Sequence, residues 1–126
     1  MQPSGPTCRA ALVALILCIA GGGAEAAGAL AIGQCGAFGR SYGFRTEAQA
    51  SDAARRECQD QQCQIVTTIR NACVAYAIDG ANPCGAHGYA SAPRLAAAQN
   101  SALRQCYKFG GKDCVIRTWA CDGRAH

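Results

Sequence analysis

Cysteine content is the feature that most constrains the fold of this chain. Ten cysteines occur in 126 residues, and eight of them follow residue 30: Cys35, Cys58, Cys63, Cys73, Cys84, Cys106, Cys114 and Cys121. An even number of cysteines in a short exported chain is typical of a disulfide framework. Zinc binding is the competing use, but no two of the eight have the tight spacing of a metal knuckle. We therefore predict four disulfides, with neither a metal nor a cofactor.

The first 26 residues show the three zones of an export signal in the required order. One basic residue, Arg9, precedes an apolar run over residues 10–20, and three glycines and Ala24-Glu25-Ala26 follow it. The run is too short to span a bilayer, and the small residues Ala24 and Ala26 suit a signal peptidase. We predict cleavage after Ala26 and a secreted or periplasmic domain over residues 27–126. A buried N-terminal helix is the alternative.

The chain is mildly basic, with a net charge of +4 that the predicted cleavage leaves unchanged, because it removes one base and one acid. Such a charge permits anionic partners but more often serves solubility. The partner classes predicted are a protein or an anionic envelope polymer, and a nucleic acid is not indicated. The basic residues considered for such a face are Arg55, Arg56, Arg104, Lys108 and Lys112.

An internal repeat is indicated by the cysteine spacing. The segment Cys35-Gly36-Ala37-Phe38-Gly39 recurs as Cys84-Gly85-Ala86-His87-Gly88, and each copy leads into an alanine-rich helical stretch that ends at Cys58 or Cys106. We expect strands at residues 29–33, 64–70, 73–78 and 115–120, and helices from Thr46 to Cys58 and from near Ser91 to Cys106. The predicted fold is a single α+β domain of two βαβ repeats (βαββαβ) with pseudo-two-fold symmetry, for which a ferredoxin-like sheet is one possible topology.

Two disulfides are predicted as local bridges that tie a helix end to the next strand, Cys58–Cys63 and Cys106–Cys114. A duplicated fold favours pairings that map onto themselves, and two sets satisfy this for the remaining four cysteines. One set joins Cys35 to Cys84 and Cys73 to Cys121 across the pseudo-axis. The other joins Cys35 to Cys73 and Cys84 to Cys121.

A family resemblance rests on three segments of the first half: residues 28–32 (GALAI), residues 63–66 (CQIV) after a helix closing on Cys58, and residues 73–77 (CVAYA). The chain resembles the secreted bacterial domain of unknown function 4189, and the second half repeats the pattern through Cys106, Cys114 and Cys121. The resemblance implies a small exported α+β domain and carries over no catalytic residue. It also implies pairing of Cys73 with Cys121, so the first set of disulfides is preferred.

Candidate site residues are few. His87 occupies the place of Phe38 in the other repeat, which predicts a semi-buried packing position. Two glycine-containing segments, residues 36–43 and 85–88, are expected as strand-to-helix turns whose free amides could hold an anion, with Arg40 and Arg45 beside the first. The leading hypothesis is a non-enzymatic binding, effector or inhibitor-like module, because no catalytic set is visible. The alternative is a secreted hydrolase that uses His87 with a nearby serine, Ser41 or Ser91.

Overall fold

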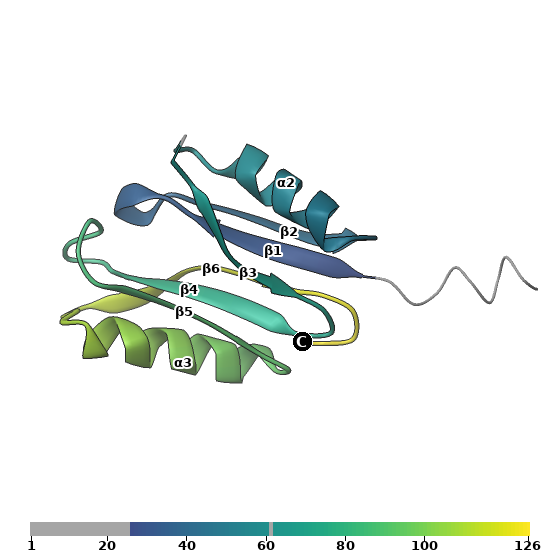
Figure 1. Cartoon of the computed structure of the whole chain (residues 1–126). Helices are drawn as coiled ribbons and strands as arrows, with labels where there is room; N and C mark the ends of the chain where they lie inside the picture. Colours follow the sequence, from purple (N-terminus) through teal and green to yellow (C-terminus); the bar gives the residue numbers. More distant parts are fainter. Residues whose placement is uncertain (1–25, 61) are drawn as a thin grey trace, which may run out of the picture.

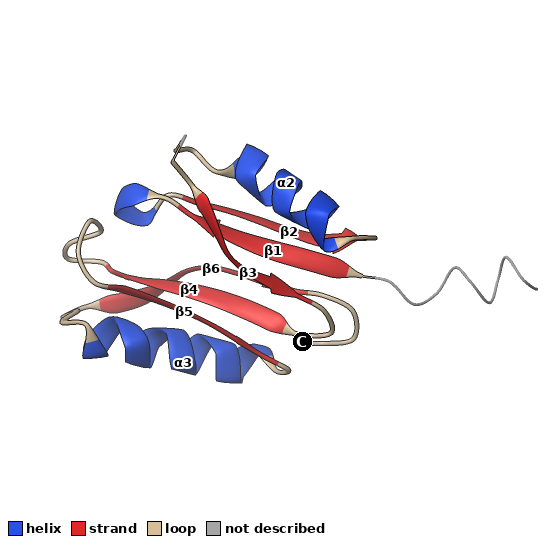
Figure 2. Ribbon diagram, viewed as in Figure 1, coloured by secondary structure: helices blue, strands red, loops and turns tan. Residues whose placement is uncertain are grey.

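Four stacked layers make up the fold in the computed structural model, which describes residues 26–60 and 62–126 (Figure 1). Two three-stranded antiparallel sheets face each other, and one helix covers the outer side of each sheet (Figure 2). The predicted α+β class is confirmed. Residues 1–25 of the predicted export signal lie outside the described residues.

The first sheet has the strand order β2-β1-β3. Its central strand is β1 (Ala27–Ile32), flanked by β2 (Phe38–Phe44) and β3 (Gln64–Ile69), and a short 3-10 turn, η1 (Gln34–Gly36), joins β1 to β2. Helix α2 (Glu47–Glu57) connects β2 to β3, and the hydroxyl of Thr46 accepts a hydrogen bond from the backbone N–H of Gln49 at its start. Thr46 therefore caps the helix that the sequence predicts to begin there.

The second sheet has the order β5-β4-β6. Its central strand is β4 (Cys73–Asp79), flanked by β5 (His87–Ala92) and β6 (Cys114–Cys121), and helix α3 (Leu95–Lys108) connects β5 to β6. The helix begins four residues after Ser91, because residues 91 and 92 complete β5, so the expected start was wrong.

The predicted order βαββαβ was incomplete, because residues 38–44 and 87–92 form strands where turns were expected. Gly39 and Gly88 resemble turn residues in the sequence, but in the structure they lie within strands because a helix packs closely against each of them. A Cβ at Gly39 would overlap the carbonyl oxygen of Ala54 in α2, and one at Gly88 would overlap that of Ala102 in α3. Glycine within a strand marks a close backbone approach, and here it lets each helix lie directly on an edge strand. The single ferredoxin-like sheet considered from the sequence was also wrong, because the strands form two separate sheets.

Side-chain size alternates along the two central strands. Alanines 27, 29 and 31 of β1 pack against α2, whereas Leu30 belongs to the core between the sheets. In β4, Cys73 and alanines 75 and 77 pack against α3, whereas Val74, Tyr76 and Ile78 face the other sheet. Small residues let the helices approach closely, and large ones fill the space between the sheets.

Four disulfides join cysteines of residues 26–60 and 62–126: Cys35–Cys84, Cys58–Cys63, Cys73–Cys121 and Cys106–Cys114. This is the first of the two sets considered from the sequence. Cys73 and Cys121 are opposite one another on β4 and β6, so this predicted pair is confirmed, but it lies within the second sheet because β4 belongs to that sheet. Among the described residues, only Cys35–Cys84 joins the two halves of the fold covalently, each half being one sheet with its helix, and it runs from η1 to the turn before β5.

Candidate functional site

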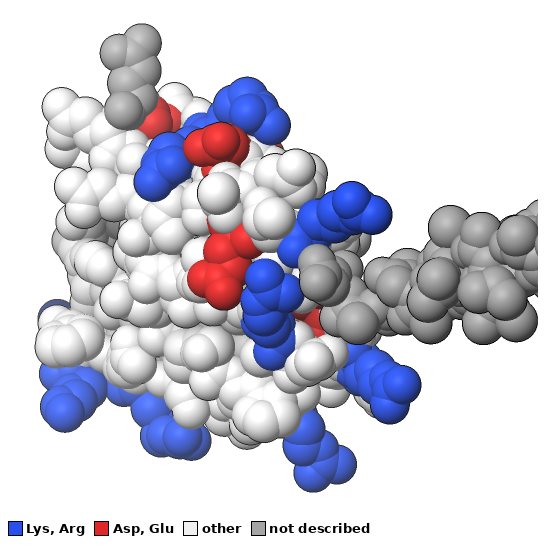
Figure 3. All heavy atoms as spheres, turned by 45° about the vertical axis from the view of Figure 1, so that its right-hand side comes forward, with Lys and Arg blue, Asp and Glu red and all other residues white. Residues whose placement is uncertain are grey.

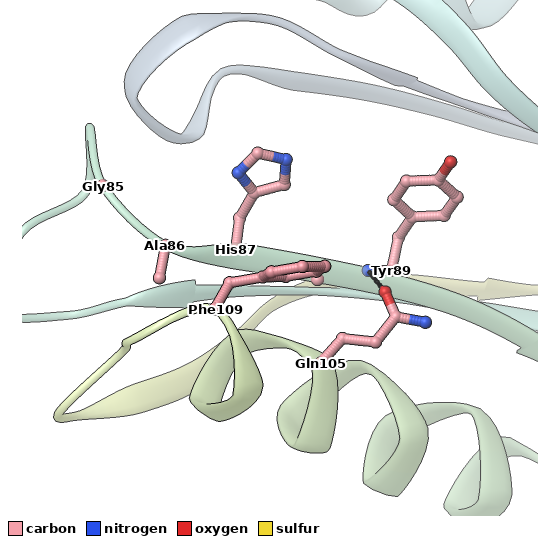
Figure 4. A pocket seen from close by; sticks show the side chains of 7 residues that line it. Gly85, Ala86, His87, Tyr89, Gln105 and Phe109 are labelled. Carbon is pink, nitrogen blue, oxygen red and sulfur yellow. Dashed lines mark hydrogen bonds between the residues drawn. The ribbon is translucent and has the colours of Figure 1, made fainter.

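A largely apolar hollow of about 450 Å³ lies at the outer edge of the second sheet. Its lining comes from β5 and its preceding turn, and from the C-terminal end of α3: Gly85, Ala86, His87, Gly88, Tyr89, Gln105 and Phe109. We call it the His87 hollow. Figure 4 shows His87 and Tyr89 rising from the same face of β5, with Phe109 lying across the edge of the strand. Phe109 is 67% exposed, which is unusual for a large apolar side chain beside a concave surface.

Two turns that flank the His87 hollow are held together by Asp79 at the end of β4. Its carboxylate, itself buried, accepts hydrogen bonds from the backbone N–H groups of Ala81, Lys112 and Asp113. These bonds, that from Ala81 foremost, hold the pKa of Asp79 below its usual value. The turn leading to β5 and the turn leading to β6 are therefore fixed relative to each other.

His87 itself is exposed, so its prediction as a semi-buried packing residue was wrong. It lies at the start of edge strand β5, opposite Ile78, where only one neighbouring strand covers it. The imidazole contacts the ring of Tyr76 edge-on, with 6.1 Å between ring centroids. His87 also lines a second concavity beside the Cys35–Cys84 disulfide, so it stands between two recesses.

Neither serine of the hydrolase hypothesis is brought to His87. The hydroxyl of Ser41 is buried in the first half and donates to the carbonyl oxygen of Ala50 at 2.6 Å. Ser91 lies four residues along β5 from His87, a separation of about 13 Å at the rise of a strand. A nucleophile and its base require hydrogen-bond contact, and this arrangement does not provide it.

The two arginines considered for an anion site are also separated from His87. Arg40 lies on β2, and its guanidinium donates to the carbonyl oxygen of Trp119 on β6. Arg45 is exposed in the bend after β2. Arg40 therefore joins the two sheets, and the three residues do not converge on one site.

The backbone amides expected to bind an anion are already engaged. The N–H groups of Phe38 and Arg40 donate to the side chains of Gln59 and Glu57, and that of Gly43 donates to Asp122. In the second half, the N–H of Gly85 donates to the carbonyl oxygen of Asn82 at 2.8 Å. The N–H of Tyr89, which follows the predicted turn, donates to the side-chain oxygen of Gln105 (Figure 4). The predicted anion-binding turns are thus strands whose outer amides are capped by side chains.

Charge is distributed unevenly between the halves. Residues 27–72, which include the first sheet, contain five basic and four acidic side chains, whereas residues 73–126, which include the second sheet, contain six basic and three acidic ones. Two of those three acids, Asp79 and Asp122, are buried. No acidic residue occurs in α3, and Figure 3 shows Lys and Arg without neighbouring Asp or Glu over the lower part of the molecule, where α3 lies in Figure 1. Arg55 of α2, by contrast, forms an ion pair with Asp52.

Residues 27–121 match the family described as domain of unknown function DUF4189. The chain belongs to this family. Three mycobacterial relatives, Protein Rv1269c and Protein MT1307 of Mycobacterium tuberculosis and Protein Mb1300c of Mycobacterium bovis, are each 36% identical to it over 99 residues. The matched region covers 79% of this chain and 72% of each relative. No solved structure matches the DUF4189 chain.

Membrane-spanning helices and clusters of metal-ligating side chains are both absent from the described part of this DUF4189 domain. No helix there is long and apolar enough to cross a bilayer. No group of three or more His, Cys, Asp or Glu side chains there is arranged to hold a metal ion. What the sequence did not reveal is the role of Phe109 and Gln105 in lining the His87 hollow. The one available signal was a large apolar residue placed directly before Gly110-Gly111 at a helix end.

Proposed function

We propose that this DUF4189 chain is an exported, non-catalytic binding module that engages an acidic protein segment through the His87 hollow and the adjoining end of α3. The observation that carries the proposal is the exposure of Phe109 beside an apolar hollow, at the end of a helix that contains no acidic residue. Four disulfides suit an extracytoplasmic location, where thiols are oxidised.

Aromatic anchors flanked by basic residues are typical of protein recognition surfaces. Such anchors supply most of the binding energy at a few central positions, while surrounding charges steer the partner. Phe109 follows Lys108 directly, and Arg104 lies one helical turn earlier on α3. A partner that inserts an apolar side chain beside Phe109 would place its own acidic residues next to these bases.

Strand addition to β5 is a less favourable mode of binding. An incoming strand needs free backbone groups at the sheet edge, but the N–H of Tyr89 already donates to Gln105 at 3.2 Å. The same holds at β2, where Glu57 and Gln59 accept from two backbone amides. Side-chain insertion into the His87 hollow requires none of these bonds to break.

Site-specific photo-crosslinking in cells that export the protein tests this proposal. A photoreactive phenylalanine analogue replaces Phe109 in one variant and Tyr42 in the control, because Tyr42 is 60% exposed but lies on β2 of the other sheet. We expect a discrete crosslinked protein from position 109 and none from position 42, and weaker crosslinking when Arg104 and Lys108 are both replaced by glutamine. Crosslinks of equal strength from both positions, or none from position 109, would contradict the proposal.

A further inference from the structure

One buried carboxylate in the structure is incompletely satisfied. Asp122, at the end of β6, is only 3% exposed, and its Oδ1 is the only buried side-chain nitrogen or oxygen atom without a hydrogen-bond partner among the described residues. Its Oδ2 accepts a hydrogen bond from the backbone N–H of Gly43 at 3.1 Å. A buried charged oxygen without a partner is costly, so it points to a cationic partner.

The Asp122 carboxylate lies beside Gly28, the second residue of β1. A Cβ placed on Gly28 would be 3.0 Å from Oδ2, so the missing side chain of Gly28 leaves room for the carboxylate. Gly43, which donates to Oδ2, directly precedes Phe44, the cross-strand partner of Ala27. Asp122 therefore lies next to the residue that follows Ala27 and next to the residue that precedes the cross-strand partner of Ala27. Ala27 itself is fully buried.

No basic side chain among the described residues forms an ion pair with Asp122. The basic residues nearest in sequence to the elements around it are Arg45 after β2, Arg70 after β3, and Arg124. Arg70 pairs with Glu47 at 3.3 Å, and Arg45 and Arg124 are exposed. No ion pair among the described residues therefore balances this carboxylate.

We propose that Asp122 binds the α-ammonium group that leader cleavage creates at Ala27. The inference rests on the cleavage site expected after Ala26 and is independent of the proposed partner. Hydrolysis of the Ala26–Ala27 peptide bond consumes one water, leaves a carboxylate on the leader and an ammonium group on Ala27. Before cleavage, the nitrogen of Ala27 is an uncharged amide and offers Asp122 no counter-charge. Processing thus completes an ion pair that locks β1 into the first sheet.

A two-by-two comparison of oxidised chains tests the pairing. One chain begins at Ala27 and the other retains Ala26, and each is prepared with Asp122 and with Asp122→Asn, which keeps an acceptor for the N–H of Gly43. We expect the chain that begins at Ala27 to melt about 5 °C higher near pH 6, the shift of a contribution on the order of 1 kcal/mol in a domain of this size. The substitution is expected to abolish that difference.

The pH dependence of the melting-temperature difference between the two chains is a second test, because a purely structural role for Asp122 would not make that difference depend on pH. Pairing raises the pKa of the ammonium group above its unfolded value of about 8, so its stabilisation is complete below that pH and is lost as the pH rises through the folded value. The melting difference between the two chains should therefore disappear in alkaline solution. The proposal would be overturned if the melting-temperature difference between the two chains were the same with Asp122 and with Asp122→Asn. It would also be overturned if the two chains melted at the same temperature even with Asp122.

A second measurement covers the case in which Asp122→Asn does not fold. The α-amino group of the folded, exported protein is expected to react with an acylating reagent at neutral pH at least about tenfold more slowly than in the urea-unfolded chain, because the ion pair holds it protonated and buried. Equal reactivity, or an exported chain whose first residue is not Ala27, would overturn the inference. Neither result would bear on binding at the His87 hollow.

Discussion

The side-chain oxygen of Gln105 accepts a hydrogen bond from the backbone N–H of Tyr89 at 3.2 Å. This contact caps the outer edge of β5 with a residue from α3, as Glu57 and Gln59 cap β2 in the first half. An uncapped edge strand is a template for pairing with another chain. The position of each helix over its edge strand therefore protects the sheet as well as covering its core.

Replacing Gln105 with alanine is expected to lower the free energy of unfolding by about 1 kcal/mol, the usual value of one hydrogen bond. It should also increase self-association, since the N–H of Tyr89 becomes free at the sheet edge. Urea denaturation and size-exclusion chromatography at several concentrations measure the two effects. Gln99→Ala, on the same helix, is the control. If Gln105→Ala had the same stability and the same self-association as Gln99→Ala, the hydrogen bond from Tyr89 to Gln105 would have no protective role.

Gly39→Ala and Gly88→Ala are expected to be among the most destabilising single substitutions in the domain. Each new methyl group would overlap a helix carbonyl oxygen, so the helix must shift away from its sheet. Overpacking of this kind costs about 1 to 3 kcal/mol or more. Ser91→Ala, at an exposed position on β5, is the control. Thermal denaturation of the two glycine variants within about 1 °C of the parent protein would be at odds with close helix packing.

These two glycines also explain what the sequence did and did not predict. Helix α2, with its Thr46 cap, and strands β3, β4 and β6 follow from hydrophobic periodicity and capping, which are local signals. Strands β2 and β5 do not, because glycine has a low strand propensity and resembles a turn when read locally. Gly39 and Gly88 are required because a helix backbone approaches each of them. That contact joins residues far apart in the sequence, so it cannot be predicted from a short segment.

The candidate site was less predictable than the fold for a related reason. His87 was placed by analogy with Phe38, but β5 ends the second sheet on that side and leaves the imidazole exposed. Phe38 and His87 occupy matching positions in the two cysteine-glycine segments, but Phe38 is half-buried and His87 is exposed. Phe109 and Gln105 become site residues only because the end of α3 lies beside the start of β5, a juxtaposition that depends on the whole half-domain.

Removing the two kinds of disulfide should have unequal costs. Cys35–Cys84 closes a loop with a sequence separation of 49, whereas Cys58–Cys63 has a separation of 5. Loop-closure entropy then predicts losses of about 4 and about 2 kcal/mol, respectively, when both cysteines of a pair are replaced by serine. Denaturant titration of the two double variants measures the losses. Equal losses, or a larger loss for Cys58–Cys63, would contradict a cross-link between the halves.

Acid should weaken the contacts made by Asp79. Backbone hydrogen bonds lower its pKa in the folded chain, so its contribution is present above its unfolded value of about 3.9 and is lost as the pH falls through the lower folded value. We expect Asp79→Asn to be less stable than the parent at about pH 6 and the gap to narrow below about pH 4. Thermal melts across this range provide the comparison. A gap that is independent of pH would show that the charge of Asp79 does not act on these turns.

The central claim is that an exported, leader-free chain is held together by the bridge between its two halves. Mass spectrometric peptide mapping of the protein recovered after export, without reduction, tests it most directly. We predict a first residue of Ala27 and the four pairs Cys35–Cys84, Cys58–Cys63, Cys73–Cys121 and Cys106–Cys114. A retained leader, free thiols in the folded protein, or Cys35 joined to Cys73 would contradict the account.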